Sequence, residues 1–145
     1  MLIYTAGPIT GLSYDTSTNW RDNLKKILPK NIQIISPMRG KDYLKESKKI
    51  EAWDENDPLR SKKGIVTRDR FDVSRCDLFF ANLSTSSKIS IGTMVEFGWA
   101  DFKRKPIITL LKKDDIIYQH PFIYELSSFI VHDLNTAAEI IKNFL

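Results

Sequence analysis

Short apolar runs alternate with amphipathic segments along the chain. Runs of mostly apolar residues predict strands, and we expect strands at residues 2–6, 32–36, 77–83, 106–111 and 129–131. The run at 77–83 is almost continuously apolar, which is typical of a central strand that is covered on both faces.

The segments between these runs have the spacing of amphipathic helices. We expect helices over about residues 19–28, 64–76 and 91–103. In the helix at 91–103, we expect the following apolar side chains to form the buried face: Ile91, Val95, Trp99 and Phe102. A last helix is predicted to begin at Thr136, because Thr136 and Glu139 have the spacing of a capping box. The charged segment 38–63 is long for a loop, so we expect a short helix or a functional excursion there.

Strands that alternate with helices predict βαβ units and a parallel sheet. The sequence therefore predicts an α/β fold: one flavodoxin-like or Rossmann-like domain over residues 1–145, with about five parallel strands and helices on both faces. In such sheets a ligand binds beyond the carboxyl ends of the strands. This rule directs attention to residues 7–13, 37–43 and 84–96, which follow the first three strands.

Composition and charge exclude several classes of protein. The net charge of the 145 residues is +4, but basic residues are interleaved with acidic ones, which disfavours a nucleic-acid binder and leaves a small anionic ligand compatible. One cysteine, Cys76, and two distant histidines predict neither a disulfide nor a metal site. We expect a cytoplasmic protein without a membrane span, because no apolar run approaches about 20 residues and the first residues do not resemble a signal peptide.

Glu96 is the first candidate for chemistry. It lies about a turn and a half inside the predicted helix 91–103, near the expected ligand crevice. Gly92 and Gly98 flank it, and each costs about 1 kcal/mol relative to alanine in a helix. Either a ligand approaches the backbone at these glycines, or they permit close packing on the sheet and Glu96 is solvated. The residues taken alone favour the second interpretation.

Asp69 and the loop after the first strand are two further candidates. Asp69 lies between Arg68 and Arg70, which is typical of a surface ion-pair network. The glycines Gly7 and Gly11 would let backbone amides approach an anion, or they form a plain strand-to-helix turn. This loop has neither the dinucleotide-binding fingerprint nor the spacing of a P-loop.

Three motifs together resemble the nucleoside 2-deoxyribosyltransferase family. Residues 4–11, Tyr-Thr-Ala-Gly-Pro-Ile-Thr-Gly, are similar to the opening of that family, and residues 90–100 are similar to its nucleophile helix, written G-x-x-x-E-x-G-x-A. Asp69 stands eight residues before Asp77, at the spacing of the family's second acid. The resemblance extends over nearly the whole chain.

The resemblance implies an enzyme that cleaves the N-glycosidic bond of a 2'-deoxynucleoside and transfers the sugar to another nucleobase. Glu96 would be the nucleophile that forms a covalent deoxyribosyl intermediate. Asp69 would protonate the departing base and later deprotonate the incoming one, and Tyr4 would hold the Glu96 carboxylate through its hydroxyl. The family needs no metal and no organic cofactor. Its members share site residues between subunits, so the resemblance also implies a homo-oligomer.

Ser90 departs from the family pattern. Many transferases carry an aspartate at this position, which binds the 5'-hydroxyl of the sugar, whereas the related deoxynucleoside 5'-monophosphate N-glycosidases carry a serine. A serine at a helix N-terminus suits a phosphate; the alternative is that Ser90 only caps the helix. The expected substrate-binding residues are Gly7, Pro8, Ile9, Thr10, Met38, Ser90 and Gly92.

Two other functions stay open beside the transferase. One is an N-glycosidase that hydrolyses a deoxynucleoside 5'-monophosphate, and the other is a module that binds a nucleotide without turnover. The expected partners are a nucleoside or nucleotide and a free nucleobase, with no nucleic acid and no membrane. Met38, Tyr43 and Trp53 either stack on the base or lie in a subunit contact.

Overall fold

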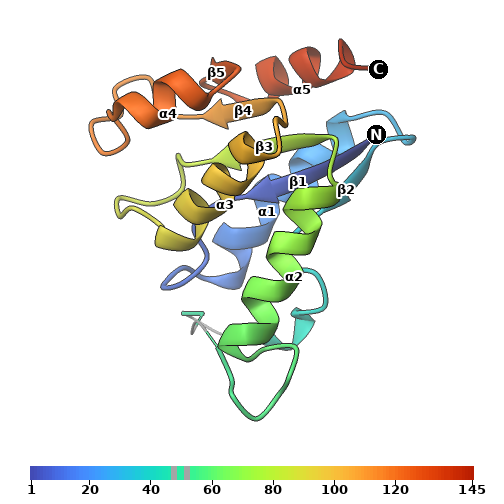
Figure 1. The fold of residues 1–145 in the computed structure, drawn as a ribbon, viewed down its shortest axis with the longest axis vertical. Coiled ribbons are helices and arrows are strands. Elements are labelled where there is room, and N and C mark those ends of the chain that lie inside the picture. The colour runs from blue at the N-terminus through green and yellow to red at the C-terminus, as the bar shows by residue number, and fades with distance from the viewer. Residues whose placement is uncertain (47–48, 51–52) are drawn as a thin grey trace.

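A sheet of five parallel strands forms the centre of the protein, in the order β2-β1-β3-β4-β5 (Figure 1). The computed structural model describes residues 1–46, 49–50 and 53–145. The strands are β1 (Leu2–Ala6), β2 (Gln33–Ile35), β3 (Leu78–Asn82), β4 (Ile107–Leu110) and β5 (Phe129–Val131). The five predicted strands and the flavodoxin-like α/β fold are therefore confirmed.

Helices cover both faces of the sheet, as predicted (Figure 1). They are α1 (Tyr14–Ile27), α2 (Lys62–Arg75), α3 (Ile91–Phe102), α4 (Pro121–Leu126) and α5 (Leu134–Lys142). On one face, Trp20 and Leu24 of α1 and Ile141 of α5 share a core with the sheet. On the other face, Val73 of α2 and Phe97 of α3 share a second core with it.

The central strand β3 supports both cores. All five of its residues are buried, and its side chains alternate between the two faces, as the period of a strand requires. Phe79 packs with Tyr4 and Phe97 on the α2–α3 side, at ring centroid distances of 5.8 Å each. Phe80 contacts Trp20 on the α1 side, also at 5.8 Å. The continuous apolar pattern of this segment is thus explained by burial on both sides.

Two helix starts differ from the sequence prediction. The helix α1 begins at Tyr14, five residues earlier than expected, because Ser13 accepts a hydrogen bond from the Thr16 amide at 3.1 Å and caps it. The prediction that Thr136 begins the last helix is wrong. Asp133 caps α5 instead, since its carboxylate accepts hydrogen bonds from the Thr136 amide and hydroxyl, both at 2.8 Å.

The predicted buried face of α3 is wrong at three of its four residues. Ile91 is 80% exposed, Phe102 is 79% exposed and Val95 is also exposed, whereas Trp99 is partly buried against the core, as predicted. The face that packs on the protein instead carries polar, charged and apolar side chains: Thr93, Glu96, Phe97 and Ala100. The edge-to-face contact of Phe97 with Phe79 and the hydrogen bond of Glu96 to Tyr4 fix this orientation. Apolar spacing alone misled the prediction because a carboxylate occupies the inner face.

The segment at 38–63 contains a short 3-10 helix at Asp42–Leu44, labelled η1, and turns before α2. The helix α4, which no pattern predicted, has only six residues and begins after the cap His120. Among residues 1–46, 49–50 and 53–145, no helix combines the length and apolar character that a membrane crossing requires.

Candidate active site

The loop after β1, the inner face of α2 and the first turns of α3 enclose a cavity of about 150 Å³, here called the carboxylate cavity. It lies at the carboxyl ends of neighbouring strands, where a parallel sheet is expected to bind ligands. It brings Asp69 and Glu96 to one place. Its lining residues are Gly7, Ile9, Thr10, Pro37, Lys41, Ile65, Asp69, Ser90, Gly92, Thr93 and Glu96.

Tyr4 anchors Glu96 from the floor of this site. The Tyr4 hydroxyl donates a hydrogen bond of 2.7 Å to Glu96 Oε1. The alternation of β1 turns Tyr4 toward the α2–α3 side, where it is fully buried and stacks on Phe79. Burial, followed by the Glu96 charge, raises the pKa of Tyr4 well above 10, so the hydroxyl stays a donor.

Glu96 is a buried acid that resists ionisation. It is 8% exposed, and burial raises its pKa to about 8, with a further contribution from the Asp69 charge. The Tyr4 hydrogen bond and the cations Arg21 and Lys41 act in the opposite direction. The carboxyl group therefore holds a proton near neutral pH, although it is surrounded by groups that favour its anion.

Asp69 comes from the inner face of α2, where Asp72 and Val73 are also buried at helical spacing. It is 6% exposed. Arg68 donates to Asp69 Oδ1 from Nε and Nη2, at 3.3 Å each. Burial raises the pKa of Asp69, although the charge of Arg68 and that of Lys41 lower it. The predicted ion pair with Arg68 exists, but it is part-buried and does not lie on the open surface, because the Asp69 side chain is buried and that of Arg68 is 21% exposed.

Two cations near the carboxylates were missed by sequence reasoning. Arg21 of α1 is 3% exposed, and it donates to the Thr5 carbonyl oxygen from Nε at 3.3 Å and from Nη2 at 3.2 Å. Burial lowers its pKa to about 10. Lys41 follows β2 in the chain, is 9% exposed and lines the carboxylate cavity. Burial, followed by the positive charge of Arg68, lowers the pKa of Lys41.

Most of the expected substrate-binding residues lie at the cavity, but two do not. Gly7, Ile9, Thr10, Ser90 and Gly92 line it. Pro8 is buried in the loop after β1 and is not among the residues that line the cavity. Met38 lines a different hollow, beside Arg21 and Asp42, so the structure does not bring it to the carboxylates.

The glycines and Ser90 at the cavity have separate local roles. A Cβ on Gly7 would lie 2.8 Å from the Asn82 carbonyl oxygen, so glycine lets the loop cross the end of β3. A Cβ on Gly92 would meet nothing within 4 Å, which leaves the N-terminus of α3 open to a ligand. Ser90 caps α3 by accepting from the Thr93 amide at 3.3 Å and from the Thr93 hydroxyl at 3.0 Å.

Comparison with known protein families agrees with this geometry. The family model described as nucleoside 2-deoxyribosyltransferase matches residues 3–138. The chain belongs to the nucleoside 2-deoxyribosyltransferase family. The match includes Tyr4, Asp69 and Glu96, which the fold brings to one cavity or its floor. Among curated protein sequences, none matches this chain.

Solved structures share the fold of this family member at low sequence identity. A conserved protein from Enterococcus faecalis V583 is 20% identical and has a TM-score of 0.71, with 100% of this chain and 99% of that chain covered. The CMP N-glycosidase BcmB of Clostridium botulinum is 18% identical, with a TM-score of 0.60 and full coverage of both chains. These similarities support the fold.

Proposed function

We propose that the protein cleaves the N-glycosidic bond of a 2'-deoxynucleoside through a covalent deoxyribosyl intermediate on Glu96, and transfers the sugar to another nucleobase. The observation that supports this most is the buried Tyr4–Glu96 hydrogen bond of 2.7 Å beside a cavity that also contains Asp69. A retaining glycosidic mechanism uses two carboxyl groups at one site, one as the nucleophile and the other as the acid and base.

The proposed reaction has two balanced halves. In the first, a Glu96 carboxylate oxygen bonds to C1', the C1'–N bond breaks, and its electron pair passes to the base nitrogen, which Asp69 protonates. In the second, the acceptor nitrogen bonds to C1', the Glu96–C1' bond breaks, and Asp69 takes the acceptor proton. Tyr4 keeps one Glu96 oxygen hydrogen-bonded and so directs the other toward the sugar.

Mass spectrometry of the intact protein tests this proposal. Incubation with 2'-deoxynucleosides is expected to give a deoxyribosyl adduct on the Glu96 peptide, and an added second base is expected to yield a new nucleoside by chromatography. Glu96→Ala is expected to abolish both signals. Glu125→Ala is the control, because Glu125 is exposed on α4. Normal turnover by Glu96→Ala would contradict the proposal.

A 5'-monophosphate N-glycosidase is the second candidate, and Ser90 favours it. Ser90 lines the carboxylate cavity at the N-terminus of α3, which gives a hydroxyl and a helix N-terminus for a phosphate. The fold similarity to a CMP N-glycosidase agrees with this candidate.

Ser90→Asp separates the two candidates because aspartate also caps helices, so the variant adds charge while keeping the cap. A nucleotide hydrolase is expected to release base from the monophosphate, ignore the free nucleoside, and lose affinity for the monophosphate in Ser90→Asp. A transferase is expected to use the free nucleoside in both proteins.

We also propose a homo-oligomer, as the family implies. The outer side of α3 carries exposed apolar residues, opposite the buried Glu96: Ile91, Val95 and Phe102. Apolar residues that share an exposed face are typical of protein interfaces. Sedimentation velocity is expected to show an oligomer that Phe102→Glu weakens. Ile116→Glu is the matched control, since Ile116 is 80% exposed and lies outside α3. A monomeric wild-type protein would contradict the proposal.

A further inference from the structure

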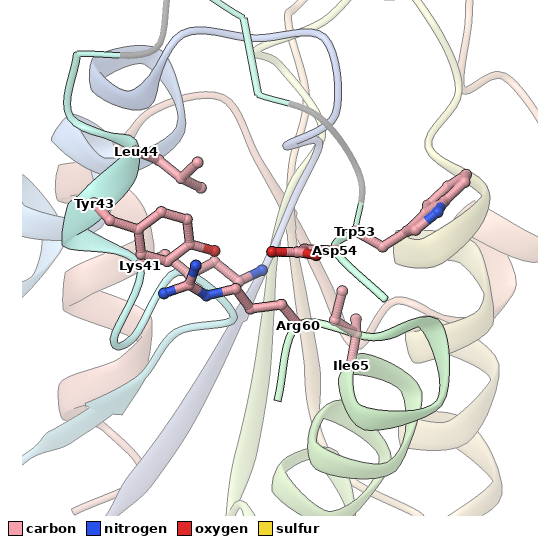
Figure 2. Close-up of a pocket in the computed structure, with 7 residues that line it drawn as sticks. All are labelled: Lys41, Tyr43, Leu44, Trp53, Asp54, Arg60 and Ile65. Carbon is pink, nitrogen blue, oxygen red and sulfur yellow. The ribbon is translucent and has the colours of Figure 1, made fainter. Parts of the chain in front are cut away.

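A second cavity adjoins the carboxylate cavity, and the reaction described so far does not use it. Its volume is about 310 Å³, at the lower end of small-molecule sites. Lys41 and Ile65 line both cavities, so the two share a wall. The residues around the second cavity are Lys41, Tyr43, Leu44, Trp53, Asp54, Arg60 and Ile65 (Figure 2).

Lys41 is the cation that this cavity leaves available. Its side chain is 9% exposed, and within residues 1–46, 49–50 and 53–145 its amine has no hydrogen-bond or ion-pair partner. Arg60, by contrast, pairs with Asp57 at 2.8 Å and packs on the Tyr43 ring at 3.5 Å. An ammonium held in a buried position without a bonded anion is a built donor site for a ligand acceptor.

Asp54 provides the matching acceptor. One of its oxygens, Oδ1, accepts from the Asn56 amide at 3.0 Å and forms a local turn. Its other oxygen has no hydrogen-bond partner among the residues that the structure describes. In Figure 2 the Lys41 amine and the Asp54 carboxylate both point into the middle of the cavity. Lys41 lines both cavities, whereas Asp54 lines this cavity and is not among the residues that line the carboxylate cavity.

We propose that this cavity binds the nucleobase, with Lys41 donating to the acceptor beside the glycosidic nitrogen and Asp54 accepting from an exocyclic amino group at the far edge. Among pyrimidines, this order selects cytosine over uracil. Both bases carry O2 next to the glycosidic nitrogen, but only cytosine carries an amino group at C4, where uracil presents a second acceptor to Asp54. This inference rests on the proposed function.

Lys41 also has a place in the bond-breaking step. When the C1'–N bond breaks, its electron pair passes to the base and spreads onto the neighbouring acceptor. An ammonium at that acceptor stabilises charge that develops only as the bond breaks. Lys41 therefore serves base binding and leaving-group stabilisation from one position between the two cavities.

Asp54→Asn tests base selection with little change elsewhere. Asparagine keeps an oxygen for the Asn56 amide, while the atom that faces the cavity changes from an acceptor to a donor. Binding is measured by calorimetry in the Glu96→Ala background, which prevents turnover, with 2'-deoxycytidine and 2'-deoxyuridine 5'-monophosphates as probes. The Glu96→Ala protein is expected to prefer the cytosine ligand by about tenfold or more. Adding Asp54→Asn is expected to remove or reverse that preference.

The control variant is Glu55→Gln. Glu55 is exposed and pairs with Lys62 at 3.3 Å. Its replacement by glutamine removes the same charge as Asp54→Asn, one residue away. Its preference is expected to equal that of the Glu96→Ala protein. Lys41→Met is expected to weaken both ligands about equally, since both carry the acceptor beside the glycosidic nitrogen.

An Asp54→Asn protein with an unchanged ratio of the two affinities would overturn the inference, and so would a preference for uracil before the change. Failure of the proposed function gives a different result: the protein with Glu96 intact would release no base from either compound, while the binding ratios would still report on Asp54. Calorimetry and chromatography together thus distinguish the two failures.

Discussion

The charge of Glu96 is expected to cost the protein stability, because the folded state raises its pKa from 4.5 to about 8. Between these values the folded protein holds a proton that the unfolded chain has released. Stability rises with pH only where the unfolded state binds more protons. Here the folded state binds more protons. The contribution of Glu96 to folding stability is therefore fully present below about pH 4.5 and is lost as the pH rises toward 8.

Glu96→Gln removes this cost while keeping the contact that positions the side chain. The amide oxygen of glutamine accepts the Tyr4 hydrogen bond in place of Oε1. At pH 7 the unfolded glutamate is ionised and the folded one is still largely protonated. Roughly 1.4 kcal/mol for each pH unit above 4.5 gives about 3 kcal/mol at pH 7. We expect the free energy of unfolding of Glu96→Gln at pH 7 to exceed that of the wild type by this amount.

Urea unfolding followed by circular dichroism at pH 5, 6, 7 and 8 measures the difference. The difference in the free energy of unfolding between Glu96→Gln and the wild type is expected to increase with pH and to become constant above about pH 8. Glu125→Gln is the control, because Glu125 is exposed, and its difference from the wild type is expected to stay flat. A gap of constant size for Glu96→Gln would refute the reasoning, since it would show that the folded state does not hold the extra proton.

Three further predictions follow from single contacts. Tyr4→Phe removes a hydrogen bond that lowers the pKa of Glu96, so we expect kcat/KM to fall roughly tenfold and the acidic limb of its pH profile to move to higher pH; an unmoved limb would contradict this. Gly7→Ala places a Cβ 2.8 Å from a carbonyl oxygen of β3, so urea unfolding is expected to show a loss of about 1–3 kcal/mol, whereas Gly92→Ala is expected to show none. Asp72→Asn weakens hydrogen bonds of 2.7 to 2.9 Å from two arginines to a buried carboxylate, and a loss of about 1–3 kcal/mol is expected in the same assay; an unchanged stability would show that the charge is dispensable.

The strands were predictable because burial on both faces leaves a continuous apolar run, as at 78–82. Helix faces were less predictable, and α3 shows why. Its apolar spacing predicted one buried face, but the helix turns a carboxylate inward and leaves Ile91 and Phe102 exposed. A periodicity argument assumes that polar residues face water, and this assumption fails where the polar residue belongs to a candidate site.

The burial of the two missed cations could not be predicted from local sequence patterns either. Arg21 follows Trp20 in α1, but nothing local indicates that its guanidinium reaches the Thr5 carbonyl oxygen of β1. Lys41 lies in a charged segment that resembles solvated surface. Their burial depends on contacts between segments far apart in the chain. The site residues that did carry a sequence signal, such as Tyr4, Asp69 and Glu96, lie in motifs that resemble those of the family.

The protonation of Glu96 that burial favours differs from the protonation that the proposed reaction needs, and this difference has a catalytic consequence. Burial and the Asp69 charge favour a protonated Glu96, whereas the proposed chemistry needs an ionised Glu96 and a protonated Asp69. The positive charge that develops at C1' in an oxocarbenium-like transition state stabilises the Glu96 anion directly. Before the bond begins to break, the sugar carries no charge, and the buried Glu96 anion is then unfavourable in free energy. Interactions that strengthen only in the transition state are the ones that increase the rate, so a buried glutamate with a raised pKa is suited to this reaction, and the Tyr4 hydroxyl keeps its anion within reach.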